Sequence, residues 1–144
     1  MTSEGTTAIA VSMIFADHIY IDKFKKIFIM GSFNVVSAKT FPCSYSPIWI
    51  YQRLTDVTGP SDQKGCFEFL YLDGEQEKII QENFPVKLNQ ERLGFSDIYF
   101  IFQNVMFPRE GKIEILFSLN EEIVNRGILY IQKVEKINSL GENK

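Results

Sequence analysis

The residues that could carry out acid–base chemistry lie close together near the start of the chain. His18 is the single histidine, and Asp17 and Asp22 flank the short apolar run His18–Ile21. A catalytic imidazole needs a carboxylate or a nucleophile within hydrogen-bonding distance, but adjacent residues of a strand point to opposite faces. We therefore interpret His18 as a surface or structural histidine. The two aspartates could form the carboxylate pair of a glycosidase, but ending a hairpin through bonds to their own backbone explains the same spacing, and we favour it.

Nucleophilic, metal and phosphate chemistry have little support in the sequence. Cys43 and Cys66 have no recognisable base beside them, and a thiolate nucleophile needs a cation or a histidine that lowers its pKa. Glu68 would raise the pKa of Cys66 if the two share a strand face. With one histidine and no Cys-x-x-Cys pair, a zinc site is not expected, and the nine glycines are isolated, which excludes the standard phosphate loops. We predict no catalytic, cofactor or metal site, and hence a protein that is not an enzyme.

One strand carries residue types that are common in binding sites. Trp49, Tyr51 and Arg53 alternate along the run Ile48–Val57, so they share one face of a strand. Aromatic residues and arginine are enriched at the energetic centres of protein interfaces. We take the three residues as a candidate interaction surface. The alternative, in which Trp49 and Tyr51 belong to the core and the other face is covered, stays open.

The elements that position these residues are predicted from alternation. In Lys112–Leu119 the apolar residues Ile113, Ile115 and Phe117 alternate with polar ones, which is the period of a half-buried strand. Similar runs, separated by Gly, Pro, Asn and Asp, cover Thr7–Phe15, His18–Ile21, Lys26–Ser37, Ile48–Val57, Gly65–Asp73, Lys78–Leu88, Asp97–Met106 and Val124–Ile137. This spacing predicts an all-β fold, a two-sheet and mostly antiparallel β-sandwich that is Ig-like or jelly-roll-like. We expect about seven to nine strands, with at most one short helix, over residues 88–94.

Two turns and one glycine give finer predictions. Asp73-Gly74 favours a tight hairpin. The Pro108–Gly111 turn predicts a hairpin that places Phe117 on one buried face with Phe100 and Phe102. Gly31 interrupts a strand, which favours a bulge that turns the strand between sheets over a place where a ligand approaches the backbone.

Composition limits the domain organisation and the compartment. The 144 residues suit one domain, expected over 7–137, with flexible termini at 1–6 and 138–144. The net charge is −3 and no basic patch is concentrated enough for nucleic acid. The apolar stretch Ala8–Ala16 is too short to span a membrane and follows no basic segment. We therefore expect a soluble cytoplasmic protein with free cysteines, without a nucleic-acid or membrane partner.

The order of short motifs resembles an uncharacterised family of small bacterial β-sandwich proteins. Its pattern is an Ala-Asp pair, here Ala16-Asp17, an acidic residue, here Asp22, a Lys-x-x-hydrophobic-x-Gly-x-Phe strand, here Lys26–Phe33, and a late Phe-Pro-x-x-Gly hairpin, here Phe107–Gly111. The resemblance runs from about Ala16 to Val134 and implies a fold and a cytoplasmic setting. It implies no reaction.

Two functions of different classes remain. The first is a non-enzymatic protein-interaction module, possibly self-associating, that uses the Ile48–Val57 strand or an exposed sheet edge. The second is a β-sandwich that binds a small ligand or a carbohydrate on exposed aromatic rings. A flat apolar patch or an open edge favours the first function, and a concavity lined by aromatic and polar groups favours the second.

Overall fold

The computed structural model describes residues 8–73, 77–88 and 94–135, which form twelve β-strands and no helix. The strands are β1 (Ile9–Ala10), β2 (Ile14–Ile21), β3 (Ile27–Phe33), β4 (Val35–Ala38), β5 (Cys43–Tyr45), β6 (Ile48–Thr55), β7 (Asp62–Tyr71), β8 (Lys78–Lys87), β9 (Phe95–Phe102), β10 (Val105–Phe107), β11 (Gly111–Leu119) and β12 (Glu122–Lys133). The all-β prediction is confirmed. The expected flexible termini, most of the expected helix and the Asp73-Gly74 turn fall outside the described residues.

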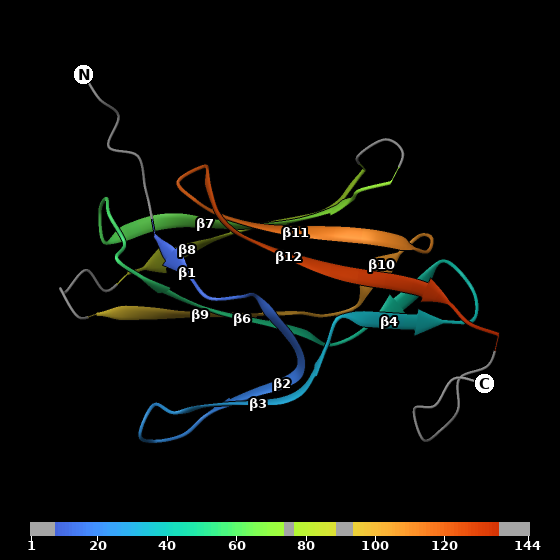
Figure 1. Cartoon of the computed structure of the whole chain (residues 1–144), viewed down its shortest axis with the longest axis horizontal. Helices are drawn as coiled ribbons and strands as arrows, with labels where there is room; N and C mark the ends of the chain where they lie inside the picture. The colour runs from blue at the N-terminus through green and yellow to red at the C-terminus, as the bar shows by residue number, and fades with distance from the viewer. Residues whose placement is uncertain (1–7, 74–76, 89–93, 136–144) are drawn as a thin grey trace.

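The strands form two five-stranded sheets that face each other (Figure 1). Sheet A contains β1, β6, β2 and β3 in that order, with β9 paired to β6. Sheet B has the order β4-β12-β11-β7-β8, and β5 and β10 form a separate short pair. All pairs are antiparallel except β4 with β12. The predicted two-sheet, mostly antiparallel sandwich is therefore confirmed.

The core is a layer of aromatic and branched side chains between the sheets. Phe67 of sheet B is fully buried, and its ring centroid lies 5.0 Å from that of Phe117 and 5.8 Å from that of Phe102 in sheet A. Phe84 of sheet B stacks on Phe100 of sheet A at 4.7 Å. Aromatic pairs at these separations add to the free energy gained by burial itself. The core thus joins the two sheets directly.

The prediction that the Pro108–Gly111 turn joins two strands of one hairpin, with Phe100, Phe102 and Phe117 on a shared face, is wrong. Phe100 and Phe102 lie on β9 in sheet A, whereas Phe117 lies on β11 in sheet B. The chain leaves sheet A after β9, forms β10 against β5, and enters sheet B through the Pro108–Gly111 turn. The rings do meet, but they do so across the core and from opposite sheets.

The strand count of seven to nine is also corrected, because several alternating runs divide. Lys26–Ser37 becomes β3 in sheet A and β4 in sheet B, and Asp97–Met106 becomes β9 and β10. Alternation continues through such a corner, so it marks extended backbone without showing where the chain changes its pairing partner.

Gly31 does not form a bulge. The β2–β3 register is the same on both sides of it, with Ala16 opposite Ser32 and His18 opposite Met30. The strand changes sheets at Asn34, between β3 and β4. Gly31 instead has a φ of 69° and lies against the Asp17 side chain, where an added Cβ would be 2.5 Å from Oδ2. The glycine is required by its backbone conformation and by this close approach.

The Ile48–Val57 run does not supply a sheet edge. β6 pairs with β9 along its whole length on one side and with β1 and β2 on the other. Its few charged residues therefore do not leave an unprotected edge. Among the described residues of sheet A, β1, β3 and β9 pair on one side only, and so does β2 over His18–Ile21.

β2 and β3 extend beyond the sandwich as a two-stranded ribbon. Residues Ile14–Ala16 of β2 pair with β6, whereas His18–Ile21 pair with β3 alone. We call residues 18–30 the β2–β3 ribbon. It lies beneath β6 and β9 as a partial third layer (Figure 1).

Candidate interaction surface

The three residues singled out on β6 do share one face, and it is the face turned away from the core. The alternate residues Ile48, Ile50, Gln52 and Leu54 are all 0% exposed and point between the two sheets. Trp49, Tyr51 and Arg53 point toward the β2–β3 ribbon. Sequence alternation placed the three together correctly, but it could not show what covers them.

The ribbon closes over two of the three residues. Tyr51 is buried in a second apolar cluster with Ala16 and Ile19, and the half-buried Trp49 and Ile29 pack against the same cluster. Both faces of β6 are therefore apolar because both are covered, one by sheet B and the other by the ribbon. This arrangement places Trp49 and Tyr51 in a small core of their own.

Arg53 is held by partners within its own sheet. Its Nε lies 2.7 Å from Asp97 Oδ1, and its guanidinium lies 4.1 Å from the centre of the Phe95 ring. The Tyr51 hydroxyl donates to the same Asp97 carboxylate. Burial, and then the hydrogen bond to Asp97, raise the pKa of Tyr51 to about 12. The three side chains therefore bind one another, and folding favours the protonated form of Tyr51.

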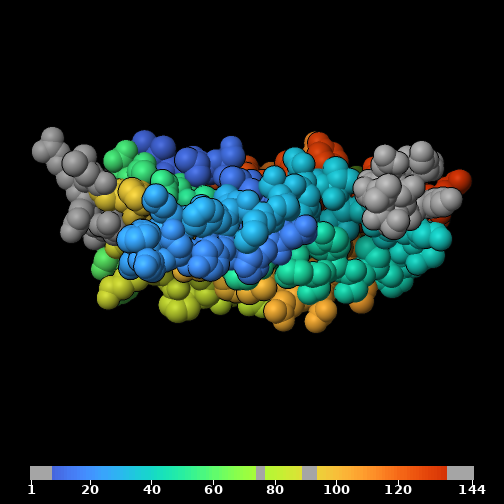
Figure 2. All heavy atoms as spheres, turned by 90° about the horizontal axis from the view of Figure 1, so that it is seen from below, coloured from blue at the N-terminus to red at the C-terminus, as the bar shows by residue number. Residues whose placement is uncertain are grey.

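Four of the large apolar side chains that are exposed lie on the ribbon, on its other face or at its tip. Tyr20, Phe28 and Met30 are 52%, 47% and 47% exposed, and Phe24 at the tip is 71% exposed. The rings of Tyr20 and Phe28 lie 5.9 Å apart, centre to centre. Seen from below, the ribbon crosses the surface of the molecule (Figure 2). The sequence analysis did not select these residues. Their alternation with Ile19, Ile27 and Ile29 does indicate a ribbon with one apolar face on each side.

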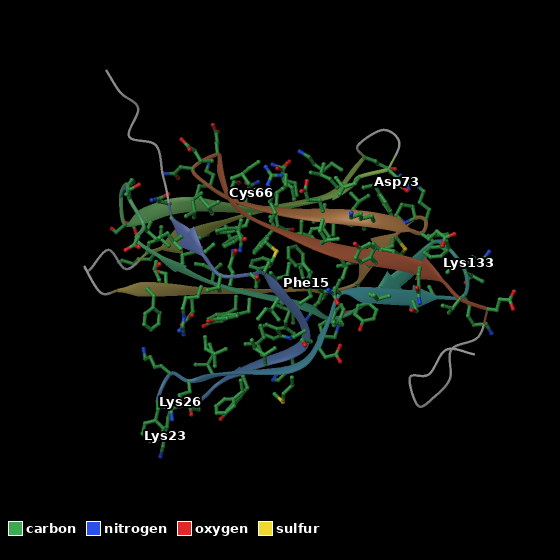
Figure 3. All side chains as sticks on the ribbon, in the orientation of Figure 1. Phe15, Lys23, Lys26, Cys66, Asp73 and Lys133 are labelled. Carbon is green, nitrogen blue, oxygen red and sulfur yellow. The ribbon has the colours of Figure 1, made fainter. Side chains whose placement is uncertain are left out.

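The tip of the ribbon is basic. Lys23, Lys25 and Lys26 are all exposed, and Lys23 and Lys26 mark its far end, away from the sandwich (Figure 3). Asp22 shapes the turn, because its Oδ1 accepts hydrogen bonds from the backbone N–H groups of Phe24 and Lys26 at 2.8 and 2.9 Å. This role agrees with the interpretation of Asp22 as a hairpin residue.

The base of the ribbon is fixed by motif residues. Ala16 is 0% exposed beneath Trp49, and Asp17 fills the space that a side chain on Gly31 would need. Asp17 Oδ1 also accepts a hydrogen bond from the Tyr45 hydroxyl at 3.2 Å. Burial and the nearby Asp17 carboxylate raise the pKa of Tyr45. The Ala-Asp and Gly positions therefore set the direction in which the ribbon leaves the sheet.

Arg109 and Gly111 belong to the Phe-Pro-x-x-Gly motif and lie at the opposite end of the sandwich. The Tyr71 hydroxyl donates to the Arg109 carbonyl, and the Arg109 guanidinium lies 4.0 Å from the Tyr71 ring centre. Arg109 Nη1 also lies 3.2 Å from Asp73 Oδ1. Gly111 has a φ of 153°, and a Cβ there would be 3.0 Å from Asp73 Oδ2. These contacts fix the turn that leads into β11.

Comparison with family models shows which family the chain belongs to. A family of unknown function (DUF6941) matches residues 11–132. The chain belongs to this family. The match includes both the ribbon and the Pro108–Gly111 turn, so the resemblance read from the sequence is confirmed. In this member of the family, the motif residues have structural roles that the contacts above explain.

Two of the solved structures that match the chain do so at low identity and low TM-score. An immunoglobulin-like protein from Pseudomonas aeruginosa is 6% identical, with a TM-score of 0.44, and the alignment covers 91% of this chain and 100% of that one. An alkylpurine DNA glycosylase from Pseudomonas fluorescens, bound to DNA with an abasic-site analogue, is 10% identical, with a TM-score of 0.38 and coverage of 84% and 30%. No curated protein matches the sequence.

The remaining candidate groups are dispersed. His18 is exposed at the base of the ribbon, with its ring edge-on to Trp49 at 5.6 Å. Cys43 and Cys66 are free thiols on different sheets, and burial, followed by the charge of Glu68, raises the pKa of Cys66 as expected. Within residues 8–73, 77–88 and 94–135, no His, Cys, Asp and Glu group suits a metal ion. The same residues contain no helix of the length and apolarity that crossing a bilayer requires.

Two hollows of the surface lie on or beside sheet B. One of about 760 Å³ lies beside the β8 edge, where Phe84, Pro85 and Val86 form its apolar part. The Phe84 ring is already stacked on Phe100 in the core. Another, of about 540 Å³, lies over the polar outer face of sheet B, around Cys66, Gln81 and Asn83.

Proposed function

We propose that this protein is a non-enzymatic protein-interaction module that binds its partner through the exposed face of the β2–β3 ribbon. The observation that carries the proposal is the group of four large apolar side chains, Tyr20, Phe24, Phe28 and Met30, each about half exposed or more. They lie on one element that projects from the sandwich.

The size of this surface supports the proposal. A buried aromatic side chain covers about 150–250 Å², so the exposed fractions of Tyr20, Phe24 and Phe28 correspond to roughly 300–400 Å² of apolar area. Met30 adds to it. This is about the size of the largest patch on a typical monomer, and such patches are often functional.

The ribbon explains why the surface differs from the one expected on β6. Tyr51 is buried and Arg53 is held by Asp97, so a partner would have to displace the ribbon to reach all three residues of the β6 set. Trp49 is half-buried at the base of the ribbon. Trp49 and Tyr51 of β6 therefore pack against the inner face of the ribbon. Direct binding of a partner by the β6 residues stays a prediction.

A non-enzymatic role accords with the chemistry of the described residues. Arg53 and Asp97 form an ion pair to which the Tyr51 hydroxyl also donates a hydrogen bond, and burial raises the pKa of the Cys43 and Cys66 thiols. Catalytic groups have pKa values near the working pH. Free cysteines suit a reducing compartment, so we also propose a cytoplasmic location for the protein.

Binding of a small ligand or a carbohydrate is the second candidate. The hollow beside β8 would be its site, since it combines Phe84 with polar groups such as Asn83 and Lys87. Because the Phe84 ring is engaged in the core, it offers only its edge as a platform. The exposed ribbon accounts for more apolar surface.

The test is affinity purification from the cells that make the protein, with quantitative mass spectrometry and lysine-reactive cross-linking. We expect the wild type to enrich a partner that cross-links to Lys23, Lys25 or Lys26, and Phe28→Asp to lose it. Met106→Asp is the matched control, because Met106 is 53% exposed on β10, away from the ribbon. A partner retained by Phe28→Asp and lost by Met106→Asp would contradict the proposal.

A further inference from the structure

We infer that the partner is an extended, acidic peptide segment that adds a strand to the free edge of β3. This inference rests on the proposed function and specifies its partner. It is carried by three features of the ribbon: the unpaired backbone of β3, the lack of charge along that strand, and the lysines at one end of it.

The backbone of β3 is available for pairing. Among the described residues, β3 pairs with β2 and has no strand on its other side. The N–H of Asp22 donates to the carbonyl of Lys26, so Lys26 directs its backbone groups toward β2. Backbone direction alternates along an antiparallel strand, so Ile27 and Ile29 direct theirs toward the open edge.

β3 lacks the features that normally prevent edge pairing. Natural edge strands are protected by charged side chains, prolines or bulges. β8, one edge of sheet B, has Pro85 and several charged residues, whereas β3 has no charged residue and no proline from Ile27 to Phe33. Its exposed side chains, Phe28 and Met30, would pack beside alternate side chains of an added strand, as in other cases of strand addition.

The position of the lysines specifies the charge of the peptide and, for an antiparallel strand, the end that carries this charge. Lys23, Lys25 and Lys26 precede β3, in a protein whose net charge is −3. An antiparallel strand on β3 would end beside them, so acidic residues at its carboxyl end would meet three exposed ammonium groups. Such complementarity raises association rates and selects the partner.

Other occupants fit the same features less well. A lipid surface would suit Phe24 and the lysines, but it cannot satisfy the backbone N–H and C=O groups of Ile27 and Ile29. A second copy could pair β3 with β3, but that strand carries no acidic residue to meet the lysines. These occupants become outcomes of the test.

The test uses the synthetic peptide Thr-Val-Thr-Tyr-Thr-Val-Glu-Asp-Glu as the probe, with fluorescence anisotropy for affinity and hydrogen exchange for geometry. We expect saturable binding, at least tenfold weaker for a peptide ending in Gln-Asn-Gln, and at least tenfold weaker for the combined variant K23E, K25E and K26E. The control variant, with K87E and K133E, should bind as the wild type does. We expect the amides of Ile27 and Ile29 to exchange at least tenfold more slowly when the peptide is bound.

Each alternative gives a different result. Binding without slower exchange at Ile27 and Ile29 would overturn strand addition. Lysine-dependent binding of phosphatidylserine vesicles without binding of the peptide would overturn it in favour of a membrane. Concentration-dependent dimerisation that protects the two amides would overturn it in favour of self-association. In all three cases, a cellular partner lost by Phe28→Asp would leave the proposed function intact, whereas a retained partner would contradict the proposed function itself.

Discussion

At the scale of single residues, three aspartates each hold nearby groups in place through hydrogen bonds or close contacts. Asp97 accepts hydrogen bonds from Tyr51 and Arg53 and lies at the outer face of sheet A. Asp17 fills the space beside Gly31 and binds Tyr45. Asp22 caps the ribbon turn. In each case the carboxylate fixes the position of the backbone or of a neighbouring side chain.

The Tyr51–Asp97 bond predicts a dependence of stability on alkaline pH. The folded pKa of Tyr51, about 12, lies above its ordinary value of 10.0, so folding favours the protonated phenol. This contribution to stability is fully present below pH 10 and is lost as the pH rises from 10 through 12. We expect the free energy of unfolding to fall more steeply over this range in the wild type than in Tyr51→Phe, as measured by urea denaturation at several pH values. Equal slopes would contradict the assignment.

Gly31 predicts a local steric and conformational cost. Gly31→Ala places a Cβ 2.5 Å from Asp17 Oδ2 on a residue with a φ of 69°, so we expect a loss of about 1–3 kcal/mol in the free energy of unfolding. Ser32→Ala, one residue further along β3, is the control and should cost less than about 0.5 kcal/mol. The double variant Asp17→Ala, Gly31→Ala should recover part of the loss. Additive effects of the two substitutions would show that the close contact is not the cause.

At the scale of elements, the β2–β3 ribbon has two apolar faces with different roles. One face packs Ile19 and Ile29 against Trp49 and Tyr51. The other exposes Tyr20, Phe28 and Met30, which no described element covers. A ribbon that is apolar on both sides is expected where one side holds it to its own domain and the other contacts a partner.

Because the ribbon packs on the sandwich through one face only, we predict that it can be released without unfolding the sandwich. Ile19 is 5% exposed, and Ile19→Ala should destabilise the packing of the ribbon by about 2 kcal/mol. We expect the emission of Trp49, the single tryptophan, to shift to longer wavelength and ribbon amides to exchange faster, while core amides are unchanged. Tyr20→Ala, on the exposed face, should leave the emission in place. A global loss of protection in Ile19→Ala would contradict the local role of this cluster.

At the scale of the whole molecule, one aromatic layer joins the two sheets. Phe67 and Phe84 of sheet B contact Phe100 of sheet A, and Phe117 lies beside Phe67. Protein interiors are close-packed, so the loss of one ring leaves a cavity that its neighbours fill only partly. Stability therefore depends on this layer, whereas the proposed binding surface lies outside it.

The aromatic layer predicts a large cost for one truncation. Phe117 is 0% exposed, and Phe117→Ala should lower the free energy of unfolding by about 3–5 kcal/mol. Tyr130→Ala is the control on the neighbouring strand β12, where Tyr130 is 45% exposed, and it should cost less than about 1 kcal/mol. Chemical denaturation measures both, and an unchanged midpoint for Phe117→Ala would place this residue outside the core.

Much of the fold could be predicted from local pattern. Alternation in Lys112–Leu119 and Gly65–Asp73 gave the correct strands and faces, because successive side chains of a strand point to opposite sides whatever the strand pairs with. The same rule placed Trp49, Tyr51 and Arg53 on one face. The short motifs at Ala16-Asp17 and Phe107–Gly111 gave the family, and the structure assigns them local steric roles.

Only the tertiary structure decided which strands are central, which are edges and which side chains are covered. The Ile48–Val57 strand was a candidate for direct association, yet β6 is paired on both sides, and the exposed residues Tyr20, Phe28 and Met30 were not singled out. The opposite sheets of Phe102 and Phe117 were likewise not foreseen. Strand pairing joins segments far apart in the chain, and its free energy depends on the packing that results. Local periodicity therefore determined the strands and their faces, and long-range packing determined which of those faces a partner can reach.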